Sequence, residues 1–157
     1  MIYNSRSENK KGRTMKDTEM ERLKILTENV PAFIYQWFER KNGQRGYYYV
    51  SPGCERMYGV SAEDLIEDWQ NLPLYEKDQK RWQKTIQEAI KDNKDWEFEG
   101  RFVLPDGSIR WWRGLSSPTW SEDGEVIFNG VIIDIQKQKN LEKDLAEKEG
   151  FYHRLKL

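Results

Sequence analysis

The sequence predicts an α+β fold in which a five-stranded antiparallel sheet carries short helices on one face and a flanking helix at each end. Residues 98–134 carry the clearest pattern, because three strand-like runs follow one another there with an Asp-Gly turn between neighbours. Two aromatic runs earlier in the chain predict a hairpin, and a charged segment with sparse leucines follows the last strand. The predicted order is therefore two strands, several short helices and a three-strand meander.

The composition indicates one domain whose core is built largely from aromatic side chains. The 157 residues include seven Trp, eight Tyr and six Phe, which supply apolar area although 34% of the residues are charged. The formal net charge of −1 gives no reason to expect nucleic acid or an anionic membrane as a partner. No apolar run approaches the roughly 18 residues of a membrane span, so we expect no membrane insertion within the chain. The single cysteine, Cys54, excludes an internal disulfide and fits a reducing, cytoplasmic location.

We expect four segments: a disordered, tag-like tail over 1–15, a flanking helix over 16–30, the folded domain over 31–137 and a helical linker over 138–157. Apolar residues at helical spacing predict the flanking helix, and Pro31 ends it. This stripe consists of Met20, Leu23, Leu26 and Val30.

The first two strands are predicted over 32–38 and 46–51, and the turn at 41–44 joins them into a hairpin. A short helix is expected over 54–57. Ser61 then has the side chain and the following acidic residues of an N-cap, so another helix begins there.

The longest helix of the domain is expected to begin at Asp78 as its N-cap and to end near Asn93. Its apolar stripe predicts the buried side chains Trp82, Ile86, Ala89 and Ile90. The last three strands are predicted over 96–104, 109–120 and 126–135.

Two ordered stretches of this chain resemble the PAS family of sensor domains, and the resemblance covers roughly residues 23–137. The first is YVSPGCERMYGVSAEDLI, over 49–66. The second is FEGRFVLPDGSIRWWRGLSSPTWSEDGEVIFNGVIIDI, with the two Asp-Gly turns, the Arg-Trp strand and the Asp-Ile end that recur in the C-terminal half of the family. The resemblance implies a five-stranded antiparallel sheet, a sensory or protein-interaction role, and a helical connection to an effector domain in cis.

The junction after the last strand is where the resemblance places signal relay. In the family an Asp and a Thr commonly couple the last strand to the exit helix; this chain has Asp134 but carries Gln136 where the Thr would stand. Between Ile133 and Ile135, the charge of Asp134 needs a partner or a hydrogen bond. Two roles stay open for Asp134, a latch for the exit helix and a simple helix cap.

The aromatic residues suggest a ligand pocket between the helices and the sheet. Such side chains stack well on an aromatic or heterocyclic ligand, but they fill a core equally well. The candidates are Tyr35, Trp37, Tyr58, Trp69, Trp82 and Trp111, with Trp112 beside them.

The sequence identifies no cofactor, and a domain without a prosthetic group is favoured. Cys54 lacks the Asn-Cys-Arg-Phe-Leu-Gln context of the flavin-adduct branch of the family, which speaks against covalent flavin. His153 lies in the terminal linker, outside the position that haem-binding relatives use. No catalytic set, phosphate loop or two-histidine metal motif occurs in the chain, so we expect no catalysis from it.

The terminal linker has a weak heptad seam, which favours a parallel homodimer over a single solvated helix. Gly150 would be a flexible point within it. The seam residues are Gln138, Leu141, Leu145, Lys148, Tyr152 and Leu155. Ile127, Val131 and Ile133 are expected on the sheet face opposite the helices, where a terminal helix or a second subunit would cover them.

Three functional hypotheses follow from these features. The first is a sensory module that detects a small ligand or partner and passes a conformational change through its C-terminal helix to an effector, either a histidine kinase of a two-component system or a cyclic-dinucleotide enzyme. The alternative is a ligand-free dimerisation spacer between sensor domains. The third is a sensor that holds flavin or another heterocycle non-covalently.

Overall fold

The residues that the computed structural model describes are 17–19, 21–22, 25–26 and 29–155. The tail predicted over 1–15 lies outside them, as do Met20 and Leu23 of the predicted N-terminal stripe. The described residues before Val30 are helical.

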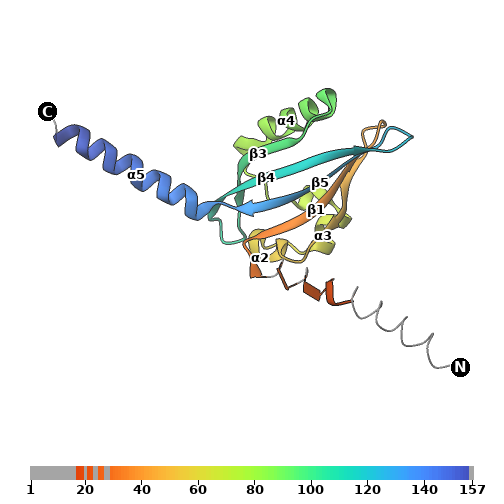
Figure 1. Cartoon of the computed structure of the whole chain (residues 1–157), viewed down its shortest axis with the longest axis horizontal. Coiled ribbons are helices and arrows are strands. Elements are labelled where there is room, and N and C mark those ends of the chain that lie inside the picture. The colour runs from red at the N-terminus through yellow and green to blue at the C-terminus, as the bar shows by residue number, and fades with distance from the viewer. Residues whose placement is uncertain (1–16, 20, 23–24, 27–28, 156–157) are drawn as a thin grey trace, which may run out of the picture.

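Five antiparallel strands form one curved sheet in the order β2-β1-β5-β4-β3 (Figure 1). The first and last strands of the chain, β1 and β5, are therefore neighbours at the middle of the sheet. The strands are β1 Ala32–Glu39, β2 Arg45–Val50, β3 Trp96–Val103, β4 Ile109–Trp120 and β5 Val126–Asp134. The predicted α+β class and five-stranded sheet are confirmed.

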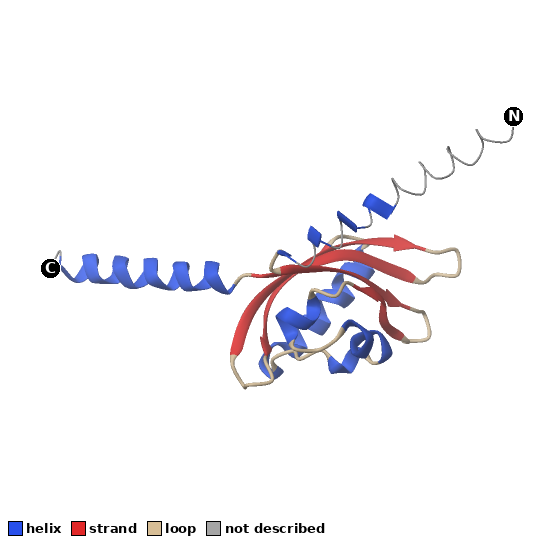
Figure 2. Ribbon diagram, turned by 90° about the horizontal axis from the view of Figure 1, so that it is seen from below, coloured by secondary structure: helices blue, strands red, loops and turns tan. Residues whose placement is uncertain are grey.

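The helices between β2 and β3 lie against the concave face of the sheet, as Figure 2 shows. The Ser61 hydroxyl accepts a hydrogen bond from the Asp64 N–H at 3.1 Å, so the predicted N-cap is confirmed. Asn93 ends the longest helix of this layer with a left-handed φ of 48°. The elements are α2 Cys54–Tyr58, α3 Ala62–Glu67, the 3₁₀ helices η1 Trp69–Asn71 and η2 Glu76–Asp78, and α4 Gln79–Asp92.

Aromatic side chains fill the space between this helical layer and the sheet. Phe33 contacts Tyr58 edge-on with ring centroids 5.2 Å apart, and Tyr58 contacts Phe102 in the same way at 4.7 Å. All three are at most 1% exposed. The core is therefore closed mainly by large rings, which offsets the high share of charged residues on the surface.

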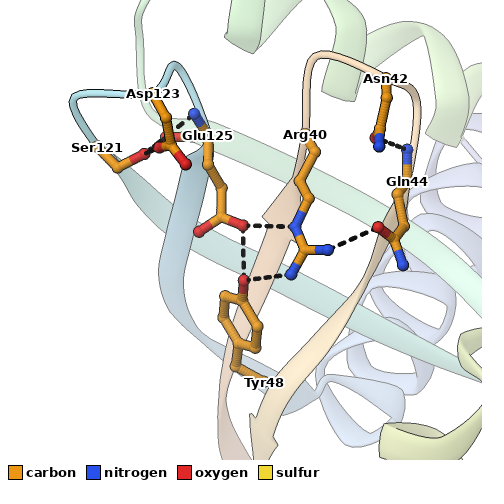
Figure 3. Close-up of polar contacts among 7 residues, drawn as sticks. All are labelled: Arg40, Asn42, Gln44, Tyr48, Ser121, Asp123 and Glu125. Atoms are coloured by element: carbon orange, nitrogen blue, oxygen red, sulfur yellow. Dashed lines mark hydrogen bonds and ion pairs between the residues drawn. The ribbon is translucent and has the colours of Figure 1, made fainter.

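A polar cluster joins the β1–β2 turn to the β4–β5 turn at the start of β5 (Figure 3). Glu125 accepts hydrogen bonds from Arg40 Nε at 2.9 Å and from the Tyr48 hydroxyl at 2.6 Å. Arg40 also donates to the Gln44 amide oxygen at 2.6 Å. The Tyr48 hydrogen bond and Arg40 lower the pKa of Glu125. The other end of β5 continues almost directly into α5, Gln136–Leu155, which leaves the domain as a rod (Figure 1).

Candidate functional site at the β5–α5 junction

Asp134, the last residue of β5, is both an ion-pair partner and a helix cap. Its Oδ2 accepts from Arg110 Nη2 at 3.0 Å and Nε at 3.2 Å, while its Oδ1 accepts from the Gln136 N–H at 2.9 Å. The carboxylate side chain is only 13% exposed, so these charge-assisted hydrogen bonds compensate for much of its lost hydration. The carboxylate thus makes the contact of a helix cap with the first N–H of α5, and its role as a latch stays a prediction.

Gln136 fastens the first turn of α5 to β4. Its Oε1 accepts from the Trp111 backbone N–H at 2.9 Å, and the Ile135 N–H donates to the Trp111 carbonyl at 3.1 Å. The Gln136 amide nitrogen also donates to Asn140 one helical turn further on, at 2.8 Å. The amide oxygen therefore gives the junction a hydrogen-bond acceptor at the position where the sequence departs from the family pattern.

Trp111 does not lie in the internal pocket where the sequence analysis placed it. Side chains of β4 alternate between the faces of the sheet, so Trp112 is buried inside and Trp111 is half-buried on the opposite face. There the Trp111 ring lies under two cations, the Lys139 amine 4.7 Å and the Arg101 guanidinium 5.0 Å from its centroid. Lys139 of α5 also pairs with Glu99 at 2.9 Å, and this bond raises the pKa of Lys139.

Asp78 links the same cluster to the start of α4. It makes no cap hydrogen bond, contrary to our expectation, because its carboxylate accepts instead from Arg101: from the backbone N–H at 2.8 Å and from Nη2 at 2.7 Å. Burial tends to raise the pKa of Asp78, but the Arg101 hydrogen bonds and charge outweigh it and the pKa is lowered. A continuous set of contacts thus runs from Asp78 through Arg101 and Trp111 to Lys139.

An internal cavity of about 30 Å³ lies between the helices and the sheet. Four of the candidate pocket residues line it, namely Tyr35, Trp37, Tyr58 and Trp82. The other lining residues are Tyr47, Leu72, Ile86, Trp96, Trp112, Ser116, Phe128 and Ile132. Pockets for drug-sized ligands measure roughly 300–1,000 Å³. Aromatic side chains therefore fill most of this space.

Trp69 does not line the cavity and lies behind two residues that do, Trp37 and Trp82. Its ring contacts those of Trp37 and Trp82 with centroids 5.6 and 5.9 Å apart, and it lines an outer groove between η1 and α4. The Arg45 guanidinium lies over all three rings at 5.4–5.7 Å. Arg45 and Trp69 therefore lie outside the cavity, packed against two of the indoles that line it, those of Trp37 and Trp82.

Cys54 and His153 have surroundings that differ sharply. Cys54 is fully buried, its thiol donates to the Val60 carbonyl at 3.5 Å, and burial raises its pKa to about 12. His153 is exposed near the end of α5. Within the described part of the chain, no group of His, Cys, Asp and Glu side chains could hold a metal ion, and no helix is long and apolar enough to cross a membrane.

The predicted linker seam is exposed along the whole of α5. No residue of α5 is buried, and the four apolar seam residues are 56–65% exposed. These residues are Leu141, Leu145, Tyr152 and Leu155. Only the first turn of the helix contacts the sheet closely, through Gln136 and Lys139.

The fold is shared with solved sensor domains. A sensory box histidine kinase/response regulator from Burkholderia thailandensis E264 superposes with a TM-score of 0.63, at 19% identity over 85% of this chain and 98% of that chain. The N-terminal domain of a diguanylate cyclase with PAS/PAC sensor from Marinobacter aquaeolei superposes at 0.55, with 21% identity over 68% of this chain and 98% of that chain. A PAS domain from Colwellia psychrerythraea superposes with a TM-score of 0.56, at 21% identity over 75% of this chain and 98% of that chain.

No curated protein matches the sequence. The family model described as PAS fold matches residues 47–132, which is more than half of the chain. That match includes most of the second strand, all the helices of the concave face and most of the meander. The chain therefore belongs to the PAS family.

Proposed function

We propose that this PAS domain is a sensory module that passes a conformational change through α5 to an effector domain outside the chain. One observation carries the proposal: the exit helix is joined to the sheet only at its first turn, through Asp134, Gln136 and Lys139. A few polar contacts, each worth about 1 kcal/mol, set the direction of a long exposed rod. A modest change inside the domain is enough to redistribute such a helix between two orientations.

The contacts from α4 to α5 give the change a physical route. Asp78 and Arg101 connect the N-terminal end of α4 to the Trp111 ring, and Trp111 carries Lys139 on its face. The helix α4 also supplies Trp82 and Ile86 to the cavity wall. A ligand or partner that moves α4 would therefore act on the same contacts that hold α5.

For the effector we propose a histidine kinase or a cyclic-dinucleotide enzyme. The support is the resemblance in fold to domains named for a histidine kinase and a diguanylate cyclase. The chain itself would contribute no catalysis. We place the module in the cytoplasm because its one cysteine is a buried free thiol with no need of an oxidising compartment.

The exposed seam of α5 supports a homodimer. Four apolar side chains along one helix would be covered if two copies of α5 paired in parallel. Sedimentation of the full chain tests this: Leu141→Lys together with Leu145→Lys is expected to shift dimer to monomer, whereas Lys143→Leu, off the seam, is not. A monomer at millimolar concentration in the unmodified chain would exclude the dimer.

A dimerisation spacer without a ligand is the second candidate, and the small cavity favours it. A double-mutant cycle with Asp134→Asn and Arg110→Gln separates the two functions. For a sensor, each variant loosens α5 and changes effector output in the parent protein, and the pair is non-additive because both changes break one contact. A spacer would show faster hydrogen exchange in α5 with unchanged effector output.

A further inference from the structure

Two buried hydrogen-bonding groups face the internal cavity without a partner. Among the described residues, the indole N–H of Trp112 and the hydroxyl of Ser116 have no partner at hydrogen-bond distance, although the residues are only 2% and 6% exposed. Ser116 has only a weak contact with the Tyr35 hydroxyl, which offsets a small part of the effect of burial on the pKa of Tyr35. A third such atom, Nε of Arg113, belongs to a guanidinium that already pairs with Glu97. An unpaired buried polar group costs about 1–3 kcal/mol, so the two cavity groups are unlike the rest of this well-paired domain.

Strand β4 places both groups on the cavity side. Trp112 and Ser116 have the same parity along the strand, and the Trp96 ring packs directly over Gly114 between them. The Trp112 ring is held between Phe98, at 5.3 Å, and Trp96, at 6.4 Å between ring centroids. Because an indole N–H can only donate, whatever pairs with Trp112 must offer an acceptor atom.

The cavity contains no charge. None of its lining residues is ionic, and burial raises the pKa of each of its three tyrosines, Tyr35, Tyr47 and Tyr58, so that the phenols stay neutral. A carboxylate or ammonium ligand would therefore lose its hydration without gaining an ionic partner. The occupant that these walls accept is neutral.

The size of the cavity limits the size of the ligand. It offers about 30 Å³ to the centre of a water-sized sphere. One water molecule needs roughly 10–15 Å³ by that measure, so the space suits a molecule of only a few non-hydrogen atoms. Flavin and haem are far larger.

We propose that this cavity binds a small, neutral organic molecule with a hydrogen-bond acceptor, such as a short ketone, which accepts from Trp112 Nε1 or from the Ser116 hydroxyl. The inference rests on the proposed sensory function and names the class of ligand that the sensor detects. Aromatic rings surround the apolar part of the molecule, and the two unpaired donors favour a molecule that has a hydrogen-bond acceptor.

Three molecules of nearly equal shape test the ligand class. Acetone has a neutral acceptor, isobutene replaces the acceptor oxygen by a methylene, and acetate carries a charge. In ¹⁵N NMR titrations of the full chain, acetone is expected to shift the Trp112 indole N–H resonance saturably, with a dissociation constant on the order of millimolar for so small a ligand. Isobutene should bind about twofold to tenfold more weakly, the value of one hydrogen bond, and acetate should leave the resonance unchanged.

Ser116→Ala is expected to weaken acetone binding by about twofold to tenfold and to leave isobutene binding unaltered. Ser117→Ala is the matched control, because the neighbouring hydroxyl is exposed on the other face. Equal affinity for isobutene and acetone, binding of acetate, or no saturable shift with any of the three would overturn the ligand class, the last result meaning that the cavity holds water alone.

Hydrogen exchange of α5 in the same samples separates this inference from the proposed function. If acetone binds and the exchange of α5 does not change, the ligand class stands and the relay fails. If Arg110→Gln loosens α5 and changes effector output in the parent protein but acetone does not bind, the relay stands and the ligand class fails.

Discussion

Replacing Gln136 tests the joint between the sheet and the exit helix most directly. Gln136→Met keeps the length of the side chain but removes the oxygen that accepts from the Trp111 N–H at 2.9 Å. Gln136→Glu is the matched control, because it keeps an acceptor at the same place. If the acceptor matters, the two variants will differ although both lose the amide donor to Asn140.

The size of the effect follows from the contacts that hold the first turn of α5. The Gln136–Trp111 hydrogen bond is worth about 1 kcal/mol, the Lys139–Trp111 cation–π contact about 0.5–1 kcal/mol, and the partly exposed Lys139–Glu99 ion pair at most about 1 kcal/mol. Loss of the first therefore removes about a third of the free energy of these three contacts, while Asp134 still accepts from the Gln136 N–H. One kcal/mol corresponds to about a fivefold change in the opening equilibrium.

Amide hydrogen exchange measured by NMR reads this opening residue by residue. In Gln136→Met, the amides of Trp111 and Lys139 should exchange about fivefold faster, while those of the buried strands keep their rates. Gln136→Glu should stay within about twofold of the unmodified chain at neutral pH, because its acceptor remains. Equal exchange in Gln136→Met and the unmodified protein would refute the claim that this bond holds the helix.

Three further changes test the surroundings of the junction. Asp78→Asn should lower the free energy of unfolding by about 1–3 kcal/mol at pH 7. Because the pKa of Asp78 is lowered in the folded state, its stabilising effect exists above the unfolded pKa of about 3.9 and is lost below it. Urea titrations of the two proteins should therefore give converging free energies of unfolding in acid. Gly130→Ala should destabilise the fold by about 1–3 kcal/mol, since a methyl group would overlap the backbone of β4, whereas Gly150→Ala has open space and should raise the helicity of α5 in circular dichroism. Glu125→Gln should speed amide exchange in the β1–β2 and β4–β5 turns, without loosening α5.

The order of strands and helices follows from patterns that the chain carries locally. Alternating apolar residues, two Asp-Gly turns and the N-cap at Ser61 each act over a few residues, so the sequence alone was enough to predict them. The position of Trp111 depended on which of two adjacent tryptophans points inward. A shift of one residue exchanges the faces of a strand, and an Arg-Trp-Trp-Arg run is compatible with either register.

The role of Asp78 could not be read from its neighbours for a different reason. A helix cap is a local contact, whereas Arg101, which donates to the Asp78 carboxylate, lies in a strand 23 residues later in the chain. Lys139 and Glu99 likewise meet only because the first turn of α5 lies against β4, the neighbour of β3. The resemblance to the PAS family therefore identified Asp134 and Gln136, and only the tertiary fold brought the Trp111 cluster together.

Under the proposed function, the weak attachment of α5 would let a small ligand act as a signal. Reversing a two-state equilibrium from 1:99 to 99:1 takes about 5.5 kcal/mol of differential binding, while a ligand gains at most about 1.5 kcal/mol per non-hydrogen atom. A molecule small enough for the cavity can thus barely reverse an equilibrium of that size, but it can readily shift one set by contacts of about 2–3 kcal/mol. Had Leu141 and Leu145 been buried on the sheet instead of 56% and 60% exposed, each would have added about 1.5–3 kcal/mol and held the helix beyond the reach of such a ligand.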